Sequence, residues 1–147
     1  ESIKEVRSIS HDLADGRVDQ MGLKQAIENL KDSLMDSGQL HFDLYLETYP
    51  QNWSIEKERE LYKIILELIG NALKHAQAKH VVLQMNVVEN TLNITFEDNG
   101  VGFDPNKVKF GLGMKTIEKR VEKLEGSWYI DSKIGHGSTT VIDIPLS

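Results

Sequence analysis

The sequence predicts an α/β fold in which helices pack on one face of a mixed β-sheet. From residue 41 onward, segments with helical spacing of apolar residues alternate with strand-like segments, in the order strand, helix, two strands, helix, two strands. Paired strands separated by single helices favour this two-layer arrangement over a doubly wound parallel sheet. With 147 residues, 39% of them apolar, the chain is long enough for one hydrophobic core.

Two helical segments are expected before the first strand. Apolar residues recur at spacings of three and four through residues 2–13, and Gly16 then interrupts the pattern, so this helix should stop near Gly16. A second helix over residues 22–34 places four apolar side chains on one stripe, namely Leu23, Ile27, Leu30 and Leu34.

Two further helices follow. A long one should start after Ser54, a plausible N-cap, and run to about Gln77. Its core side is formed by Leu61, Ile65, Leu68, Ala72 and Ala76. A short helix is expected over residues 114–124.

The strands are indicated by alternation of apolar and polar residues. The first covers residues 41–48, and the next two cover 80–88 and 91–98, joined by the two-residue turn Glu89-Asn90. Residues 127–133 and 138–146 form a closing hairpin across 134–137.

Composition and charge exclude several classes of partner. The formal net charge is -6 and no basic stripe with interleaved aromatic residues occurs, so we expect no nucleic-acid partner. There is no cysteine, no apolar run near the roughly 18 residues of a membrane span, and no leader-like segment. We therefore expect a cytosolic setting, including the cytosolic end of a membrane-bound sensor, and no direct membrane contact.

The long helix carries a polar edge in the stretch "ELIGNALKHA". Glu67, Asn71, Lys74 and His75 stand at i, i+4, i+7 and i+8, within one stripe of about 100 degrees that flanks the apolar stripe. A solvated polar edge would also explain them, because such residues are common at this spacing.

Asp98 ends the strand of "FEDNGVGFD" on its core side, because it shares a face with Leu92, Ile94 and Phe96. A carboxylate buried there needs a hydrogen-bond donor, which a cap, a turn or a ligand amino group would supply. Gly100 and Gly102 then let the backbone turn and approach a ligand closely.

Gly111 and Gly113 lead directly into the short helix, where free amide groups favour phosphate. The stretch is neither a Walker A loop nor a dinucleotide fingerprint. His75 and His80 lack the His-Glu-x-x-His spacing, so no zinc site is expected from them.

Taken in order, "ELIGNALKHA", "EDNGVGFD" and "FGLGM" resemble the N, G1 and G2 boxes of the GHKL (Bergerat) ATP-binding fold, specifically the catalytic domain of sensor histidine kinases. The resemblance covers residues 38–147. It implies a two-layer α/β sandwich that binds ATP and Mg²⁺ between helices and sheet.

The resemblance implies a role for each matching residue. Glu67 and Asn71 are the implied catalytic residues, and Asn71 is also the implied Mg²⁺ ligand. Lys74 and His75 match positions near phosphate, and Asp98 matches the acceptor for the adenine amino group. The remaining matches are Gly100 and Gly102 beside the base, Gly111, Leu112, Gly113 and Met114 at the end of the lid, and Ser138 near adenine, with Thr140 competing for that role.

The short lid over residues 103–110 is typical of the branch that pairs with helix-turn-helix response regulators. That resemblance implies that residues 1–37 are the end of the second dimerisation helix plus a helical connector. The phosphoacceptor histidine would then lie on a dimerisation domain outside this chain, so His11 of "SISHDLAD" is not the expected target. The implied partners are that domain, from the same or a partner protomer, and a response regulator receiver domain.

Two other functions stay open. One is an anti-sigma-factor-type Ser/Thr kinase, although the leading helix "EVRSIS" favours the histidine kinase. The other is a non-catalytic nucleotide-binding module.

Overall fold

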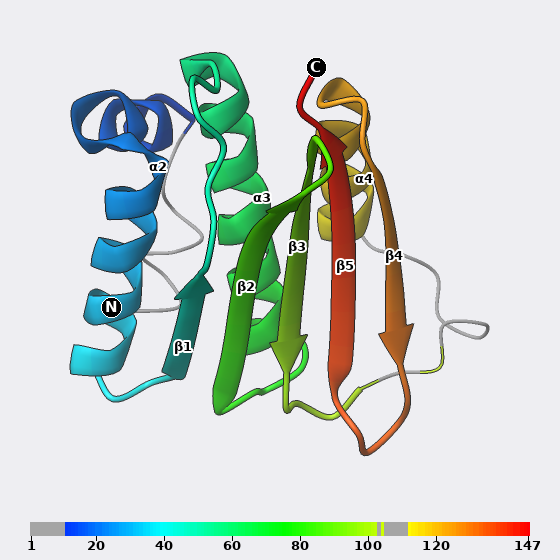
Figure 1. The fold of residues 1–147 in the computed structure, drawn as a ribbon. Coiled ribbons are helices and arrows are strands. Elements are labelled where there is room, and N and C mark those ends of the chain that lie inside the picture. Colours follow the sequence, from blue (N-terminus) through cyan, green and yellow to red (C-terminus); the bar gives the residue numbers. More distant parts are fainter. Residues whose placement is uncertain (1–10, 103, 105–111) are drawn as a thin grey trace.

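The computed structural model describes residues 11–102, 104 and 112–147, which form one sheet covered by helices on one side (Figure 1). The strands are β1 (His41–Leu46), β2 (His80–Val88), β3 (Thr91–Asp98), β4 (Ser127–Ser132) and β5 (Ser138–Pro145). Their order in the sheet is β1-β2-β3-β5-β4, with β1 parallel to β2 and all other neighbours antiparallel. The predicted mixed sheet is confirmed.

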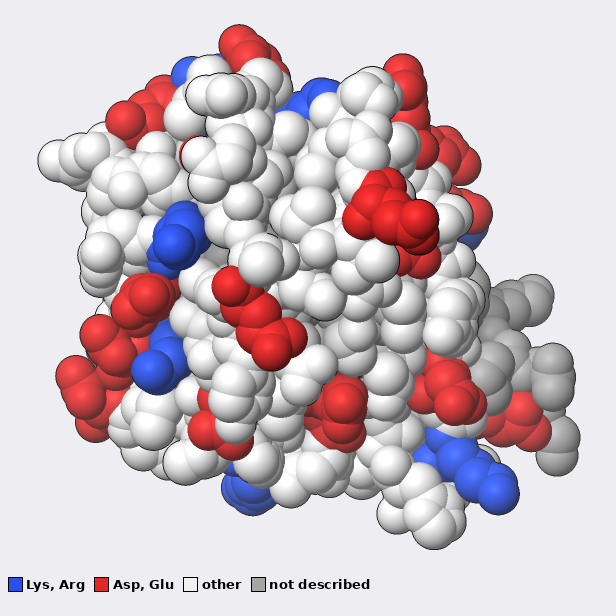
Figure 2. All heavy atoms as spheres, viewed as in Figure 1, with Lys and Arg blue, Asp and Glu red and all other residues white. Residues whose placement is uncertain are grey.

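Helices α2 (His11–Asp36), α3 (Ile55–Lys74) and α4 (Leu112–Lys123) lie on the same side of this sheet (Figure 1). The predicted two-layer architecture is therefore confirmed. On the opposite face, acidic side chains are scattered and basic ones are isolated (Figure 2). No helix in the described part of the chain has both the length and the apolar composition that a membrane span requires.

The strands alternate as predicted. Leu92, Ile94 and Phe96 of β3 are buried against the helices. Glu89 and Asn90, which join β2 to β3, both have positive φ values of 48° and 63°. Two successive residues with positive φ form the type of turn whose twist matches a tight antiparallel hairpin, so the predicted two-residue connection is confirmed.

Helix α3 begins as predicted and ends earlier than predicted. The Ser54 side chain accepts a hydrogen bond from the Lys57 amide at 3.2 Å and caps the helix. The predicted end at Gln77 is wrong: the helix stops at Lys74, His75 is its C-cap, and Gln77 has a left-handed φ of 54°. Of the predicted core side, four residues are buried, namely Leu61, Ile65, Leu68 and Ala72.

The predicted helix end near Gly16 is also wrong. Helix α2 continues through Gly16 and instead breaks at Gly22, whose φ and ψ are 83° and 162°. A glycine within a helix costs about 1 kcal/mol relative to alanine, and burial of Ala14 and Val18 on either side of Gly16 holds that turn in place. Gly22 adopts a backbone conformation that other residues rarely tolerate.

The break in α2 is held by Glu58 of α3. One carboxylate oxygen accepts a hydrogen bond from the Leu23 amide at 3.3 Å, and the other accepts from the Tyr49 hydroxyl at 2.6 Å. The Leu23 amide lies one residue after the break, where no helical carbonyl is in place to accept from it. Glu58 therefore pins the second half of α2 to the start of α3.

The predicted stripe of the second half of α2 belongs to the main hydrophobic core. All four of its members are buried together with α3 and the sheet, namely Leu23, Ile27, Leu30 and Leu34. At the rim, Arg59 of α3 donates two hydrogen bonds of 2.8 Å to the Asp19 carboxylate. Helix α2 is thus an integral part of the folded unit.

Replacing Ile27 with alanine should lower the free energy of unfolding of the whole unit by about 2–5 kcal/mol, since it opens a cavity in the shared core. Urea denaturation followed through Trp53 and Trp128, which pack against the core, measures this. The matched control is Glu28→Ala at the adjacent exposed position. A Trp transition that Ile27→Ala leaves in place would contradict a single core.

Candidate functional site

The predicted site residues of α3, β3, β5 and residues 99–102 gather at one end of the sheet. Three segments meet there: the C-terminal half of α3, the end of β3 with residues 99–102, and the start of β5 (Figure 1). Residues 99–102 are hydrogen-bonded to the segment after α3 and to the β4–β5 turn. The Val101 amide donates to the Ala76 carbonyl at 2.9 Å, and the Gly135 amide donates to the Val101 carbonyl at 2.6 Å.

Asp98 lies where the alternation predicted it, on the helix side of β3 and only partly buried. Its carboxylate accepts a hydrogen bond from the Gly100 amide at 2.8 Å. Burial raises the pKa of the Asp98 carboxyl above its ordinary value, and the Gly100 hydrogen bond opposes that rise. A carboxylate offers about four acceptor positions, so a single bond from Gly100 leaves room for another donor.

Ser138 and Thr140 are both buried, at different depths in the sheet. Ser138 is the register partner of Asp98. Thr140 is paired with Phe96, two residues further along the strand from this end of the sheet. The Ser138 hydroxyl lies 2.7 Å from the Ser132 hydroxyl. Ser132 was not predicted as a site residue, because only the β4–β5 register brings it beside Ser138.

Gly100 and Gly102 are required by the protein's own packing. A Cβ atom on Gly100 would overlap the Ala76 carbonyl oxygen. Gly102 has a φ of 71°, and a Cβ there would overlap the Lys133 carbonyl oxygen. The sequence predicted freedom to approach a ligand; the contacts found are with neighbouring backbone.

Gly137 is a structural residue of the site that was not predicted from the sequence. Its φ is 76°, and a Cβ atom there would overlap the Asp98 carbonyl oxygen. In the sequence it looked like an ordinary hairpin glycine. The signal for its second role is its position directly before Ser138, which pairs with Asp98.

The polar edge of α3 divides into two parts. Glu67 and Asn71 are half-buried, while Lys74 and His75 are exposed at the helix end. The Asn71 side-chain amide donates to the Met114 sulfur at 3.6 Å, which joins α3 to α4 beside the site. The four residues therefore share the predicted edge, with Asn71 facing α4.

The glycine-rich segment before α4 is only partly described. Gly111 lies outside the described residues, as do Phe103 and residues 105–110 of the predicted lid. Leu112 and Gly113 are the first residues of α4, which therefore starts two residues earlier than predicted, and Met114 packs against the core.

Residues 56–147, more than half of the chain, match the family of histidine kinase-, DNA gyrase B- and HSP90-like ATPases. The chain belongs to this family. The matched range carries Asp98, its partner Ser138 and the polar edge of α3. The GHKL resemblance of the three sequence boxes is thereby confirmed.

Several curated relatives of this ATPase chain are sensor kinases. Sensor histidine kinase ComP of Bacillus subtilis is 29% identical over 147 residues, covering 98% of this chain and 19% of the relative. The histidine-protein kinase/phosphatase DegS of the same species is 36% identical over 115 residues, covering 74% and 29%. Oxygen sensor histidine kinase NreB of Staphylococcus carnosus is 29% identical, covering 99% and 42%. The chain thus spans less than half the length of these relatives.

Solved structures share the fold. The histidine kinase domain of the blue-light activated kinase EL346 from Erythrobacter litoralis superposes with a TM-score of 0.71 at 22% identity, covering 84% of this chain and 61% of that one. Full-length ShkA in complex with AMPPNP gives a TM-score of 0.65 at 19% identity, covering 89% and 29%. These likenesses support the fold of the ATPase family member described above.

Substituting alanine for Gly100 should lower the free energy of unfolding by about 1–3 kcal/mol, because the added methyl group meets the Ala76 carbonyl. The same substitution at Gly16, which is helical with nothing within 4 Å of a new Cβ, should raise it by about 0.5–1 kcal/mol. Chemical denaturation of both variants provides the comparison. Equal effects of the two substitutions would refute the close approach of residue 100 to Ala76.

Proposed function

We propose that this chain is the catalytic, ATP-binding portion of a two-component sensor histidine kinase. It binds Mg-ATP and transfers the γ-phosphoryl group to a histidine of a dimerisation domain outside this chain. Membership of the ATPase family and similarity to ComP, DegS and NreB, which are named as sensor kinases, support the proposal.

The environment of Asp98 is the observation that carries this proposal. Its carboxylate has a raised pKa because of burial, and the Gly100 amide is its hydrogen-bond donor among the described residues. The exocyclic amino group of adenine would supply a second donor and so offset the cost of burying the charge. Ser138, directly opposite Asp98, is better located than Thr140 to meet the same ring.

The phosphate end of the nucleotide would lie between α3 and α4. The Asn71 amide nitrogen faces Met114, which leaves the amide oxygen to meet a cation. An oxygen donor suits Mg²⁺, which would neutralise charge on the phosphates when bound. Glu67 lies one turn before Asn71. The phosphate oxygens would be contacted by Lys74 and His75 at the exposed end of α3. They would also accept hydrogen bonds from the amides of Gly111, Leu112 and Gly113.

The wider arrangement is also part of the proposal. Residues 1–37 are the end of the second dimerisation helix plus a connector, and residues 38–147 are the ATP-binding domain. The partners are a histidine-containing dimerisation domain and a response regulator receiver domain. The acceptor histidine lies on that domain, and His11 has no part in phosphotransfer.

Replacing Asp98 with asparagine should weaken ATP binding by about 1–3 kcal/mol, because the amide cannot accept from adenine as a carboxylate does. Isothermal titration calorimetry with ATP measures the loss. Asp131→Asn on the exposed side of β4 makes the same chemical change away from the site and should bind ATP like the parent protein. Equal affinity in Asp98→Asn and the parent would remove the main support for the nucleotide site.

Incubation with radiolabelled ATP, Mg²⁺ and a cognate dimerisation domain tests phosphotransfer. The expected product is acid-labile phosphohistidine, whereas an acid-stable phosphoserine would identify a Ser/Thr kinase. Asn71→Ala should lose both this labelling and the Mg²⁺-dependent part of ATP binding. Asn29→Ala, at an exposed position of α2, should keep both. Tight ATP binding without transfer, using a dimerisation domain that another kinase phosphorylates, would favour a binding module.

A further inference from the structure

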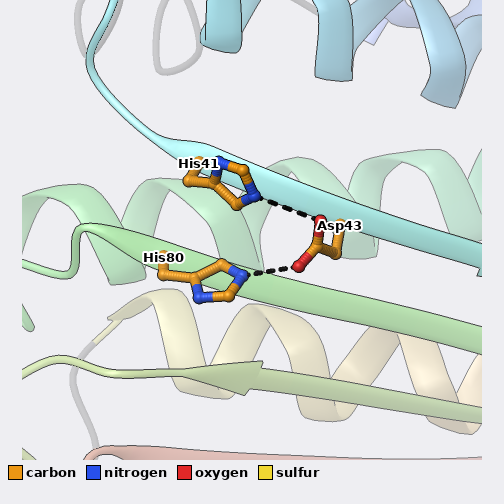
Figure 3. Close-up of side chains that lie close together, drawn as sticks. All are labelled: His41, Asp43 and His80. Carbon is orange, nitrogen blue, oxygen red and sulfur yellow. Dashed lines mark hydrogen bonds and ion pairs between the residues drawn. The ribbon is translucent and has the colours of Figure 1, made fainter.

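Two histidines and one aspartate converge on the face of the sheet opposite the helices. Figure 3 shows the rings of His41 and His80 directed at the Asp43 carboxylate from two neighbouring strands. The His41 Nε2 atom lies 3.2 Å from Asp43 Oδ1, and the His80 Nε2 atom lies 2.7 Å from Asp43 Oδ2. These residues take no part in the nucleotide site proposed above.

The strand register produces this cluster. His41 of β1 is the register partner of His80 of β2, and Asp43 follows His41 by two residues, so it points to the same face. The two rings meet edge to face, with centroids 4.7 Å apart and planes inclined at 83°. Both Nε2 atoms therefore approach one carboxylate from different directions.

The donor atoms suit a borderline transition-metal ion. Two imidazole nitrogens and one carboxylate oxygen are a common ligand set for Zn²⁺. One such atom from each residue lies within 4.8 Å of the others. Ligands about 2.0–2.2 Å from a tetrahedral ion are roughly 3.3 Å apart, so small side-chain rotations would bring these three into position.

Access and charge also favour a cation. The His41 and His80 side chains are 58% and 40% exposed, so an ion can enter from solution. With neutral imidazoles the cluster carries the single negative charge of Asp43. Glu97 of β3 adds a second negative charge on the same face of the sheet, since it is paired with Val82 and lies diagonal to His80.

We propose that His41, Asp43 and His80 form a binding site for one Zn²⁺ ion. Each neutral ring shifts its proton to Nδ1 and binds the ion through Nε2, one Asp43 carboxylate oxygen is the third ligand, and a water molecule completes the coordination. The Asn99 side chain holds the backbone at the start of β2, because its oxygen accepts hydrogen bonds from the amides of Lys79 and His80, each at 2.9 Å. This support fixes the backbone that carries the His80 ring.

Calorimetric titration of the nucleotide-free protein with Zn²⁺ in a non-chelating buffer tests the site. We expect one ion per chain at this site, and His41→Gln or His80→Gln should weaken its binding by more than about tenfold. His136→Gln, an exposed histidine in the β4–β5 turn, is the matched control and should bind like the parent protein. Mg²⁺, which prefers oxygen ligands, should not replace Zn²⁺.

Nitrogen-detected NMR of the imidazole rings gives a second readout that does not need a variant. Zn²⁺ should shift the Nε2 resonances of His41 and His80 and leave those of His136 unchanged. If either glutamine variant fails to fold, Asp43→Asn replaces it in the test. This variant keeps both rings, and it should bind Zn²⁺ with lower affinity than the parent protein. Absence of Zn²⁺ binding, or binding that survives both histidine substitutions, would overturn the proposal.

Discussion

The rotation of α3 about its own axis is the constraint on which the site depends. Its buried stripe, which includes Leu61, Ile65 and Leu68, packs against the sheet and so fixes which side of the helix meets water. Because Glu67 and Asn71 flank that stripe, they are held half-buried at the boundary between core and solvent. A polar group at such a boundary is oriented by packing and still reaches a ligand. The same helix is gripped on one side by α2, through Glu58 and Leu23, and on the other by α4.

The sheet register supplies the second half of the site. Asp98 and Ser138 share a register position at the ends of β3 and β5, and Gly137 packs directly over the Asp98 backbone. A slip of one residue would turn Asp98 to the opposite face, where its carboxylate would be exposed to solvent and away from the proposed nucleotide site. The glycines around it are therefore required for more than turn formation: each removes a Cβ atom from a point where two backbones touch.

Periodicity predicted what depends on local spacing and missed what depends on tertiary contact. The alternation along β3 placed Asp98 on the correct face, and helical spacing placed Leu23 and Ile27 in the core. Gly16 and Gly22 look alike in sequence, but the helix passes through the first and breaks at the second, where the Leu23 amide donates to Glu58 of α3, a partner 35 residues away in the chain. The convergence of His41 and His80 was invisible, because it arises from the parallel pairing of two strands that are separated in the chain by α3.

The folded unit is larger than the segment that the family match covers. That match starts at residue 56, yet the core includes Ala14, Val18 and Ile27 of α2 and Phe42 of β1. Without α2, the side of α3 that contacts these residues would be exposed to water. The folded state would lose about 25 cal/mol of stabilising free energy for every Å² of apolar surface exposed. The Asp19–Arg59 ion pair adds little, since it lies at the rim. Apolar burial is therefore what joins α2 to the ATPase fold, and any movement of α2 must be accommodated by α3, the helix that carries Asn71.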